Sequence, residues 1–235
     1  MMKKVLMLVL ITLQFGLYAE DRCEKKVVDN FKAEYSIYSG FLTKKVNYYR
    51  EGSRVAYEYP SAGMTEVWTK LPKNRVSLTR IFNNYQRSIE YDTIDLQMEN
   101  RDSSWGSHKN FSFIKNIDYD LGQEEELNGC KVWHYVKRGE NLEINMYWDS
   151  KRDLLISFDL KENNVYKYRY QLLSLKQEEQ GYIQKTLAYD ATDYADIGDN
   201  ESDPFFRKMI SLGFIQHKEA NIIDEHGNAL EIAHK

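Results

Sequence analysis

The chain has 235 residues, of which 42% are hydrophobic and 14% aromatic, with 18 tyrosines but only 3 prolines and 2 cysteines. This composition excludes a collagen-like, low-complexity or disulfide-dense scaffold, and its aromatic content argues against a wholly disordered chain. The formal net charge of −4 argues against nucleic-acid binding, which relies on clustered lysine and arginine.

Residues 1–19 have the features of a secretory signal peptide. Lys3 and Lys4 form a basic start, residues 5–17 form an apolar run, and Ala19 is a small residue before the expected cut. The run is shorter than the roughly 20 residues that a permanent membrane helix needs, which disfavours the alternative of a retained anchor. We therefore expect a periplasmic protein that is exported by means of a cleaved signal peptide.

The two cysteines, Cys23 and Cys130, are predicted to form a disulfide, because exported proteins fold in an oxidising compartment. In the chain-entropy model such a long loop makes the bridge worth ~3–5 kcal/mol. Two free thiols are the alternative. A redox-active pair is disfavoured because the cysteines lack Cys-x-x-Cys spacing.

From residue 31 onward, alternation of apolar and polar residues predicts half-buried antiparallel strands with short connections. Turns are expected at Gly52, Asn83-Asn84, Asn163-Asn164 and Gly181. The predicted strands are 31–38, 46–50, 55–59, 65–71, 75–82, 85–91, 131–138, 142–148, 156–160, 165–175 and 182–189. The fold class is therefore mainly β, with about ten antiparallel strands.

Two stretches depart from this alternation. Residues 97–110 are polar and are expected to form a loop or short helix that crosses the sheet. Asp203-Pro204 predicts a helix start, because Asp caps free amides and Pro suits the first helical position, and Gly213 is placed to end that helix. The predicted organisation is one domain over residues 20–213, followed by a polar tail at residues 214–235.

No nucleophile elbow, zinc motif, phosphate-binding loop or dinucleotide fingerprint occurs in the sequence. We therefore expect no catalytic residue, no cofactor and no enzyme activity. His134 alternates with aromatic residues in a predicted strand, which favours a hydrogen-bonded sheet histidine. Four acids near the predicted helix are weak candidates for a Ca²⁺ site, but their spacing suits a solvated turn better. They are Asp193, Asp196, Asp199 and Glu201.

Aromatic residues recur on single faces of the predicted strands, as Tyr166, Tyr168 and Tyr170 do. Such rows suit either a cavity for an apolar ligand or a closed core beneath a covering helix. A sheet with one clear covering helix leaves apolar surface that must close on itself or meet a ligand. The residues predicted to bind a ligand are Tyr48, Tyr57, Tyr59, Trp148, Tyr166, Tyr168 and Tyr170.

The stretch 128–161, with its Asn128-Gly129-Cys130 turn and its Trp-Asp-Ser-Lys-Arg-Asp-Leu-Leu turn at residues 148–155, resembles the hairpins of the bacterial lipoprotein-carrier (LolA/LolB-like) superfamily. This resemblance implies a single strongly curved antiparallel sheet, an incomplete barrel that shelters acyl chains, preceded by an N-terminal helix at residues 20–30. Residues 91–105 and 193–204 resemble segments of uncharacterised exported bacterial proteins instead.

Two functions follow from these expectations. The first is a non-catalytic periplasmic binding protein that shelters a lipid or an acylated partner protein on a concave aromatic face, in peripheral contact with the cell envelope. The alternative is an envelope structural or interaction protein with a closed core, no small ligand, and acidic or edge segments that dock a partner.

Overall fold

The computed structural model describes residues 30–111, 114–127, 130–177, 181–200 and 202–215, and two short segments, 222–223 and 229–230. The predicted signal peptide, Cys23, Glu201 and all but the last residue of the predicted N-terminal helix lie outside the described residues. No helix of the described part is long and apolar enough to cross a membrane.

The strands of the main sheet follow the hairpin pattern that the sequence predicts. They are β1 (Phe31–Ser39), β2 (Leu42–Glu51), β3 (Arg54–Tyr59), β4 (Met64–Lys70), β5 (Val76–Phe82), β6 (Arg87–Tyr91), β7 (Leu121–Leu127), β8 (Cys130–Arg138), β9 (Leu142–Asp149), β10 (Leu154–Glu162), β11 (Val165–Gln177) and β12 (Asp190–Asp193).

Helices occupy the connections and the end of the described chain. The α-helices are α1 (Thr93–Met98), α2 (Trp105–His108), α3 (Tyr182–Thr186) and α4 (Pro204–Ser211). Short 3₁₀ helices are η1 (Pro60–Ala62), η2 (Pro72–Asn74), η3 (Asn83–Tyr85) and η5 (Tyr194–Asn200). Within the predicted polar tail, β13 (Ile222–Ile223) and β14 (Ala229–Leu230) form a separate antiparallel pair.

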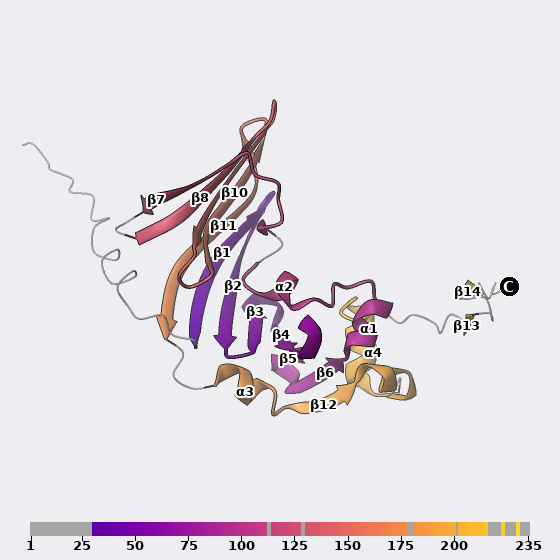
Figure 1. The fold of residues 1–235 in the computed structure, drawn as a ribbon. Coiled ribbons are helices and arrows are strands. Elements are labelled where there is room, and N and C mark those ends of the chain that lie inside the picture. The colour runs from indigo at the N-terminus through magenta and orange to yellow at the C-terminus, as the bar shows by residue number, and fades with distance from the viewer. Residues whose placement is uncertain are drawn as a thin grey trace, which may run out of the picture.

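The main sheet is open and curved, with the order β12-β6-β5-β4-β3-β2-β1-β11-β10-β9-β8-β7 (Figure 1). It has twelve strands rather than about ten. It is also not wholly antiparallel, because β12 runs parallel to β6. The unpredicted β7 is an exposed edge strand whose three consecutive glutamates, at 124–126, interrupt the alternation that identifies a half-buried strand.

Two of the predicted hairpin turns have the expected left-handed backbone, whereas at Asn83-Asn84 the left-handed residue is Gln86, with a φ of 50°. Gly52 connects β2 to β3 with a φ of 55°. Asn163 and Asn164 connect β10 to β11 with φ values of 51° and 62°, the left-handed pair that favours asparagine in a two-residue hairpin. These turn residues fix the register of the hairpins, and the register determines which side chains face the concave side of the sheet.

The strand predicted over residues 182–189 is wrong, because this segment begins with α3. Ile183 and Thr186 lie one helical turn apart and are both buried. The ring of Tyr182 stacks on that of Tyr49, with 4.0 Å between centroids, and its hydroxyl lies 2.9 Å from the Thr65 hydroxyl. Packing on the outer face of the sheet therefore decides the helical conformation, as it does for most short helices.

The helix predicted after Asp203 is confirmed as α4. The Asp203 carboxylate accepts a hydrogen bond of 2.8 Å from the Phe205 amide and lies 3.1 Å from the Arg87 guanidinium. Phe205, Phe206 and Met209 are buried in the main core. One face of α4 thus packs against the sheet, and its first turn is tied to β6 through Arg87.

The chain crosses the concave face between β6 and β7, because β7 is one edge strand and β6 lies next to the other. The crossing segment is defined as residues 101–111 and contains α2, as Figure 1 shows. This confirms the expectation that residues near 97–110 cross the sheet. A large aromatic core lies on this side and includes Tyr35, Tyr48 and Phe111.

Side chains of the sheet fix the crossing segment. The Tyr57 hydroxyl donates to the His108 carbonyl at 2.8 Å and accepts from the Phe111 amide at 3.0 Å. The wholly buried Asn110 accepts hydrogen bonds from the Tyr48 hydroxyl and from Arg50. Asn110 and Phe111 both have left-handed backbone, with φ values of 58° and 56°. Such a conformation is costly for a bulky residue such as Phe and persists where its surroundings impose it.

Replacing Asn110 tests this network. Asn110→Ala leaves the buried Tyr48 hydroxyl without its acceptor and removes one acceptor of Arg50, which still donates to the Arg152 and Asp153 carbonyls. We therefore expect the free energy of unfolding to fall by about 3 kcal/mol in urea denaturation. Asn100→Ala is the matched control, because Asn100 is exposed and also left-handed, with a φ of 55°. It should lose only about 1 kcal/mol, the cost of the backbone conformation. Equal losses would contradict the network.

Candidate functional site

A cleft of about 400 Å³ remains open on the concave side, beside the crossing segment. Its size lies within the range of about 300–1,000 Å³ that ligand clefts occupy. Most of its wall is aromatic or aliphatic, and the polar side chains are fewer. The apolar lining consists of Ile37, Val46, Tyr57, Tyr59, Trp68, Phe111, Tyr168 and Tyr170, and the polar lining of Ser39, Lys44, Glu66, Arg101, Ser107 and His108.

One wall of the cleft joins the sheet to α2. The Trp68 ring, on β4, stacks on the His108 ring with 3.4 Å between centroids and 9° between planes. The Arg101 guanidinium lies over the same indole, 5.1 Å from its centroid. Burial lowers the pKa of His108, although its hydrogen bond to the Asp102 carbonyl opposes this effect. The imidazole is therefore neutral at pH 7, and this wall is a flat aromatic surface.

An ion-pair network that includes Glu66 and Arg101 lies beside this wall of the cleft. One oxygen of the Glu66 carboxylate lies 2.9 Å from Arg80 and 3.3 Å from Arg101. The side chains of Glu66 and Arg80 are each only 13% exposed, so solvent screens this pair less than an ordinary surface pair. Burial raises the pKa of the neighbouring Tyr59, which keeps its hydroxyl protonated.

The opposite end of the cleft lies near two hairpin tips. Ser39 is paired with Tyr168 across β1 and β11, and Tyr168 is 46% exposed. The β1–β2 tip carries the fully exposed Phe41 and the exposed Leu42, and the β10–β11 tip carries the exposed Val165. This end of the sheet therefore presents apolar side chains to solvent.

The predicted ligand-binding residues fall into three groups. Tyr48 and Trp148 are buried in the core, where Tyr48 contacts Asn110 and Trp148 lies beneath the Lys115 ammonium at 3.8 Å from the ring centroid. Tyr57 is also buried but reaches the cleft with its ring. The cleft-lining residues that remain accessible are Tyr59, Tyr168 and Tyr170.

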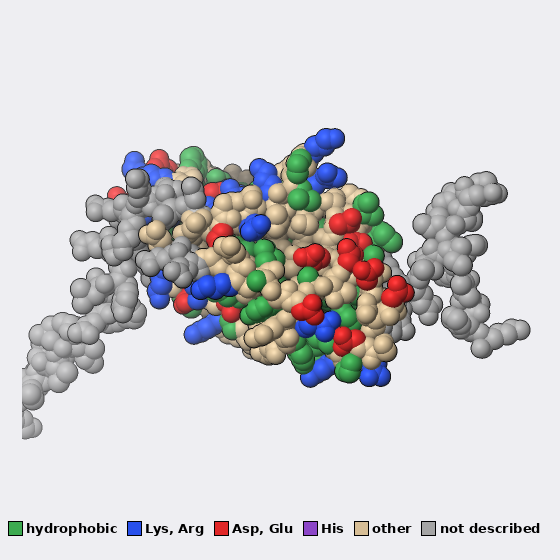
Figure 2. Space-filling model, turned by 90° about the horizontal axis from the view of Figure 1, so that it is seen from below, with side chains coloured by type: hydrophobic (Ala, Val, Ile, Leu, Met, Phe, Trp, Pro, Cys, Tyr) green, Lys and Arg blue, Asp and Glu red, His purple; other side chains and the backbone are tan. Residues whose placement is uncertain are grey.

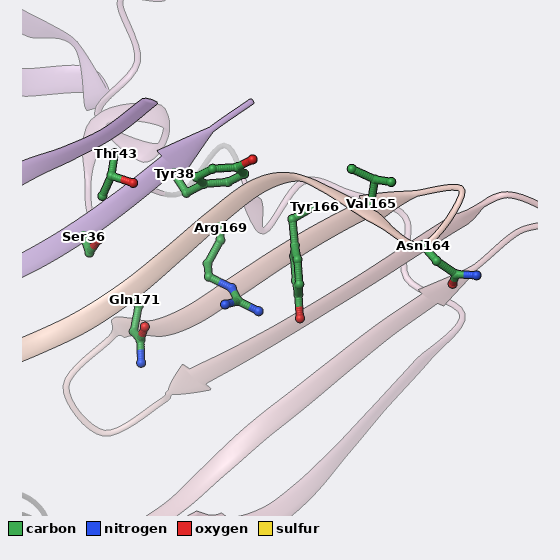
Figure 3. Close-up of a pocket in the computed structure, with 8 residues that line it drawn as sticks. All are labelled: Ser36, Tyr38, Thr43, Asn164, Val165, Tyr166, Arg169 and Gln171. Atoms are coloured by element: carbon green, nitrogen blue, oxygen red, sulfur yellow. The ribbon is translucent and has the colours of Figure 1, made fainter. Parts of the chain in front are cut away.

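Tyr166 forms the third group, because it lies on the other face of the sheet. A β-bulge shifts the pairing of β10 with β11 by one residue. Leu160 pairs with Tyr168, but the next residue, Lys161, pairs with Tyr166. The alternation of residues 166, 168 and 170 is therefore broken at this point. Tyr166 instead lines an outer pocket of about 560 Å³, where the Arg169 guanidinium lies 3.8 Å from its ring centroid (Figure 3).

The acidic segment is exposed. Figure 2 shows acidic side chains on the surface toward the end of the molecule that carries α1 and α4. Asp193, Asp196 and Asp199 belong to β12 and η5 and are all exposed, and Asp193 accepts a hydrogen bond from the Ala195 amide. Among the described residues, no group of three or more histidine, cysteine or acidic side chains could hold a metal ion.

Two further predictions concern His134 and the cysteines. The His134 ring lies 2.9 Å from Glu125 and 3.1 Å from Asn145, so it is the hydrogen-bonded sheet histidine that the pattern predicts. The disulfide stays a prediction, because Cys23 lies outside the described residues. Sequence reasoning missed Trp68, Arg101 and His108 as cleft residues. The expectation that residues 97–110 cross the sheet was the one signal that could have located Arg101 and His108.

No protein-family model matches the sequence, and no curated protein matches it. Similar solved structures include PNGF-II, with a TM-score of 0.44, 10% identity, and coverage of 84% of this chain but 37% of that one. The chain thus spans little more than a third of that protein. The Pseudomonas aeruginosa MucA/MucB complex gives a TM-score of 0.37, 10% identity, and coverage of 67% and 54%.

A DUF1329 family protein from Desulfovibrio piger gives a TM-score of 0.30 at 11% identity, and the match covers 64% of this chain and 86% of that one. Structures of MucB are thus among the neighbours of this chain, at 10–11% identity. At these identities the likeness concerns the fold alone.

The pKa of Tyr48 supplies a test of how tightly the crossing segment covers the sheet. Burial raises this pKa to about 12 from an ordinary value of 10.0. The folded protein therefore holds the proton more tightly, and this contribution to stability is complete below about pH 10 and is lost as the pH rises toward 12.

Urea denaturation at several pH values should show that Tyr48→Phe loses stability less steeply than the parent protein between about pH 10 and 11.5. The difference in slope should reach at most about 1.4 kcal/mol per pH unit. Parallel curves for the two proteins would mean that water reaches the Tyr48 hydroxyl in the folded state.

Proposed function

We propose that the protein is a non-catalytic periplasmic binding protein, exported by means of a cleaved signal peptide, that shelters an acyl chain of a lipid or lipidated partner in the concave cleft. The observation that carries this proposal is the open aromatic cleft beside the crossing segment. Its rings of Tyr59, Tyr168 and Tyr170 present apolar surface that the core leaves uncovered.

The chemistry of the cleft supports binding over catalysis. Glu66 is engaged by two guanidinium groups, and the pKa of His108 is lowered while its ring is stacked on Trp68. The Ser107 hydroxyl of the same lining donates to the Asp102 carboxylate, and the His108 ring bonds to the Asp102 carbonyl, so these two side chains are not arranged as a nucleophile and its base. An apolar chain, in contrast, gains free energy simply by leaving water for such a cleft.

A closed-core interaction protein of the envelope is the second candidate. It is favoured by the burial of Tyr48 and Trp148, since these predicted ligand residues serve the core. In this account the apolar cleft is a shallow irregularity of the surface, and partners dock on the edge strand β7 or on the acidic segment.

Binding of a fluorescent fatty acid separates the two candidates. We expect saturable binding by the wild-type protein and, for Tyr168→Ala, a dissociation constant about three- to tenfold higher, because the ligand loses an aromatic contact worth ~1 kcal/mol. Tyr166→Ala is the matched control, since Tyr166 lies two residues away on the opposite face. It should bind within about twofold of wild type.

The absence of saturable binding by the folded wild-type protein would overturn the acyl-chain proposal and favour the interaction protein. Equal weakening by Tyr168→Ala and Tyr166→Ala would also contradict it, because a ligand in the concave cleft contacts only one of these rings.

A further inference from the structure

The charges that line the concave cleft are unequal in sign. Lys44 and Arg101 are the lysine and arginine of the lining, and Glu66 is its one acidic residue. His108 is the remaining titratable base, and its stacking on Trp68 places it in the apolar wall. The described lining therefore carries one more positive than negative charge.

Arg101 is the less available of these two cations, because its guanidinium already lies 3.3 Å from Glu66. Its guanidinium shares the Glu66 carboxylate with Arg80, and the Arg80 guanidinium also donates to the Phe214 carbonyl at 2.5 Å. These contacts hold the ion-pair network at one end of the cleft. A ligand that broke them would leave half-buried charges unpaired, which is costly.

Lys44 differs from Arg101 because it forms no ion pair with any described residue. It is exposed on β2 opposite Ile37 of β1, near the end of the cleft where Ser39 and Tyr168 lie. The ammonium therefore stands at the mouth, beyond the apolar wall. An amphiphile that placed its chain along the rings would bring its polar end to this position.

We propose that the cleft selects single-chain amphiphiles with an anionic head group, a carboxylate or a phosphate, and that Lys44 binds that head group. This inference rests on the proposed function, because it assumes that the cleft holds the chain. A lysine is a mobile point charge with three donors, which suits either anion without discriminating strongly between them.

The neighbouring Lys45 provides a matched control. Lys44 pairs with Ile37, whose side chain lines the concave cleft, whereas Lys45 pairs with Ser36, whose side chain lines the outer pocket. Removing either lysine changes the net charge equally. Only the loss of Lys44 removes a cation from the cleft.

The test uses competition of hexadecanoate, hexadecyl phosphate and hexadecanol against one fluorescent fatty acid at pH 8. We expect both anions to displace the probe from the wild-type protein about three- to tenfold more effectively than the alcohol of equal chain length. Lys44→Gln should reduce this ratio to near one, and Lys45→Gln should preserve it. Comparison of the two anions shows whether the carboxylate or the phosphate binds more tightly.

The outcomes separate this inference from the function on which it rests. If the alcohol competes as well as the anions, selection of an anionic head group is wrong while acyl-chain binding stands. If the anions are preferred but Lys44→Gln leaves the ratio unchanged, the assignment to Lys44 is wrong. If the probe binds but no competitor displaces it, or if the probe does not bind, the acyl-chain function fails as well.

Discussion

The segment that crosses the concave face is fixed by hydrogen bonds from side chains of the sheet, and the rest of the structure depends on this attachment. The Tyr57 hydroxyl bridges the His108 carbonyl and the Phe111 amide, and Asn110 lies buried between Tyr48 and Arg50. A sheet this open cannot bury its concave face alone. The crossing segment covers part of it and leaves the cleft at its side.

This attachment explains why tyrosine rather than phenylalanine suits positions 48 and 57. A phenylalanine at position 48 or 57 would fill the same space in the core but could not satisfy the polar backbone and amide groups of a buried crossing segment. The aromatic residues of the concave face therefore do not all serve one role, because some form the core and others line the cleft. Rings beneath the segment form core, and rings beside it, such as Tyr59 and Tyr170, line the cleft.

The predictable parts of the fold are those set by local chemistry. Left-handed Asn163 and Asn164, the Asp203 cap and the alternation in β1 all act within a few residues. The segment of α3 was predicted as a strand because packing on Tyr49 and Thr65, far away in the sequence, decides its conformation. β12 is acidic and forms only by pairing with β6, so no local pattern marks it.

Local sequence patterns also predicted some residues of the candidate site, and contacts between distant residues determine the others. Tyr59, Tyr168 and Tyr170 have the expected access to a concave cleft, because strand alternation places them on that face. Tyr166 does not, since a bulge depends on the register with a neighbouring strand. Trp68 lies on a predicted strand, but the sequence does not predict that it forms a wall of the cleft. That wall depends on the stacking of His108 on Trp68, and the path of the crossing segment places His108 there.

Tryptophan quenching by a brominated fatty acid would test most directly whether an acyl chain occupies the cleft, because bromine quenches an indole only at contact. Trp68 lines the cleft, whereas Trp133 lies on β8 and is 37% exposed. We expect bromination to quench the wild-type protein and the Trp133→Phe variant, and to have little effect on Trp68→Phe. Undiminished quenching in Trp68→Phe would contradict the account, because the chain would then bind elsewhere on the molecule.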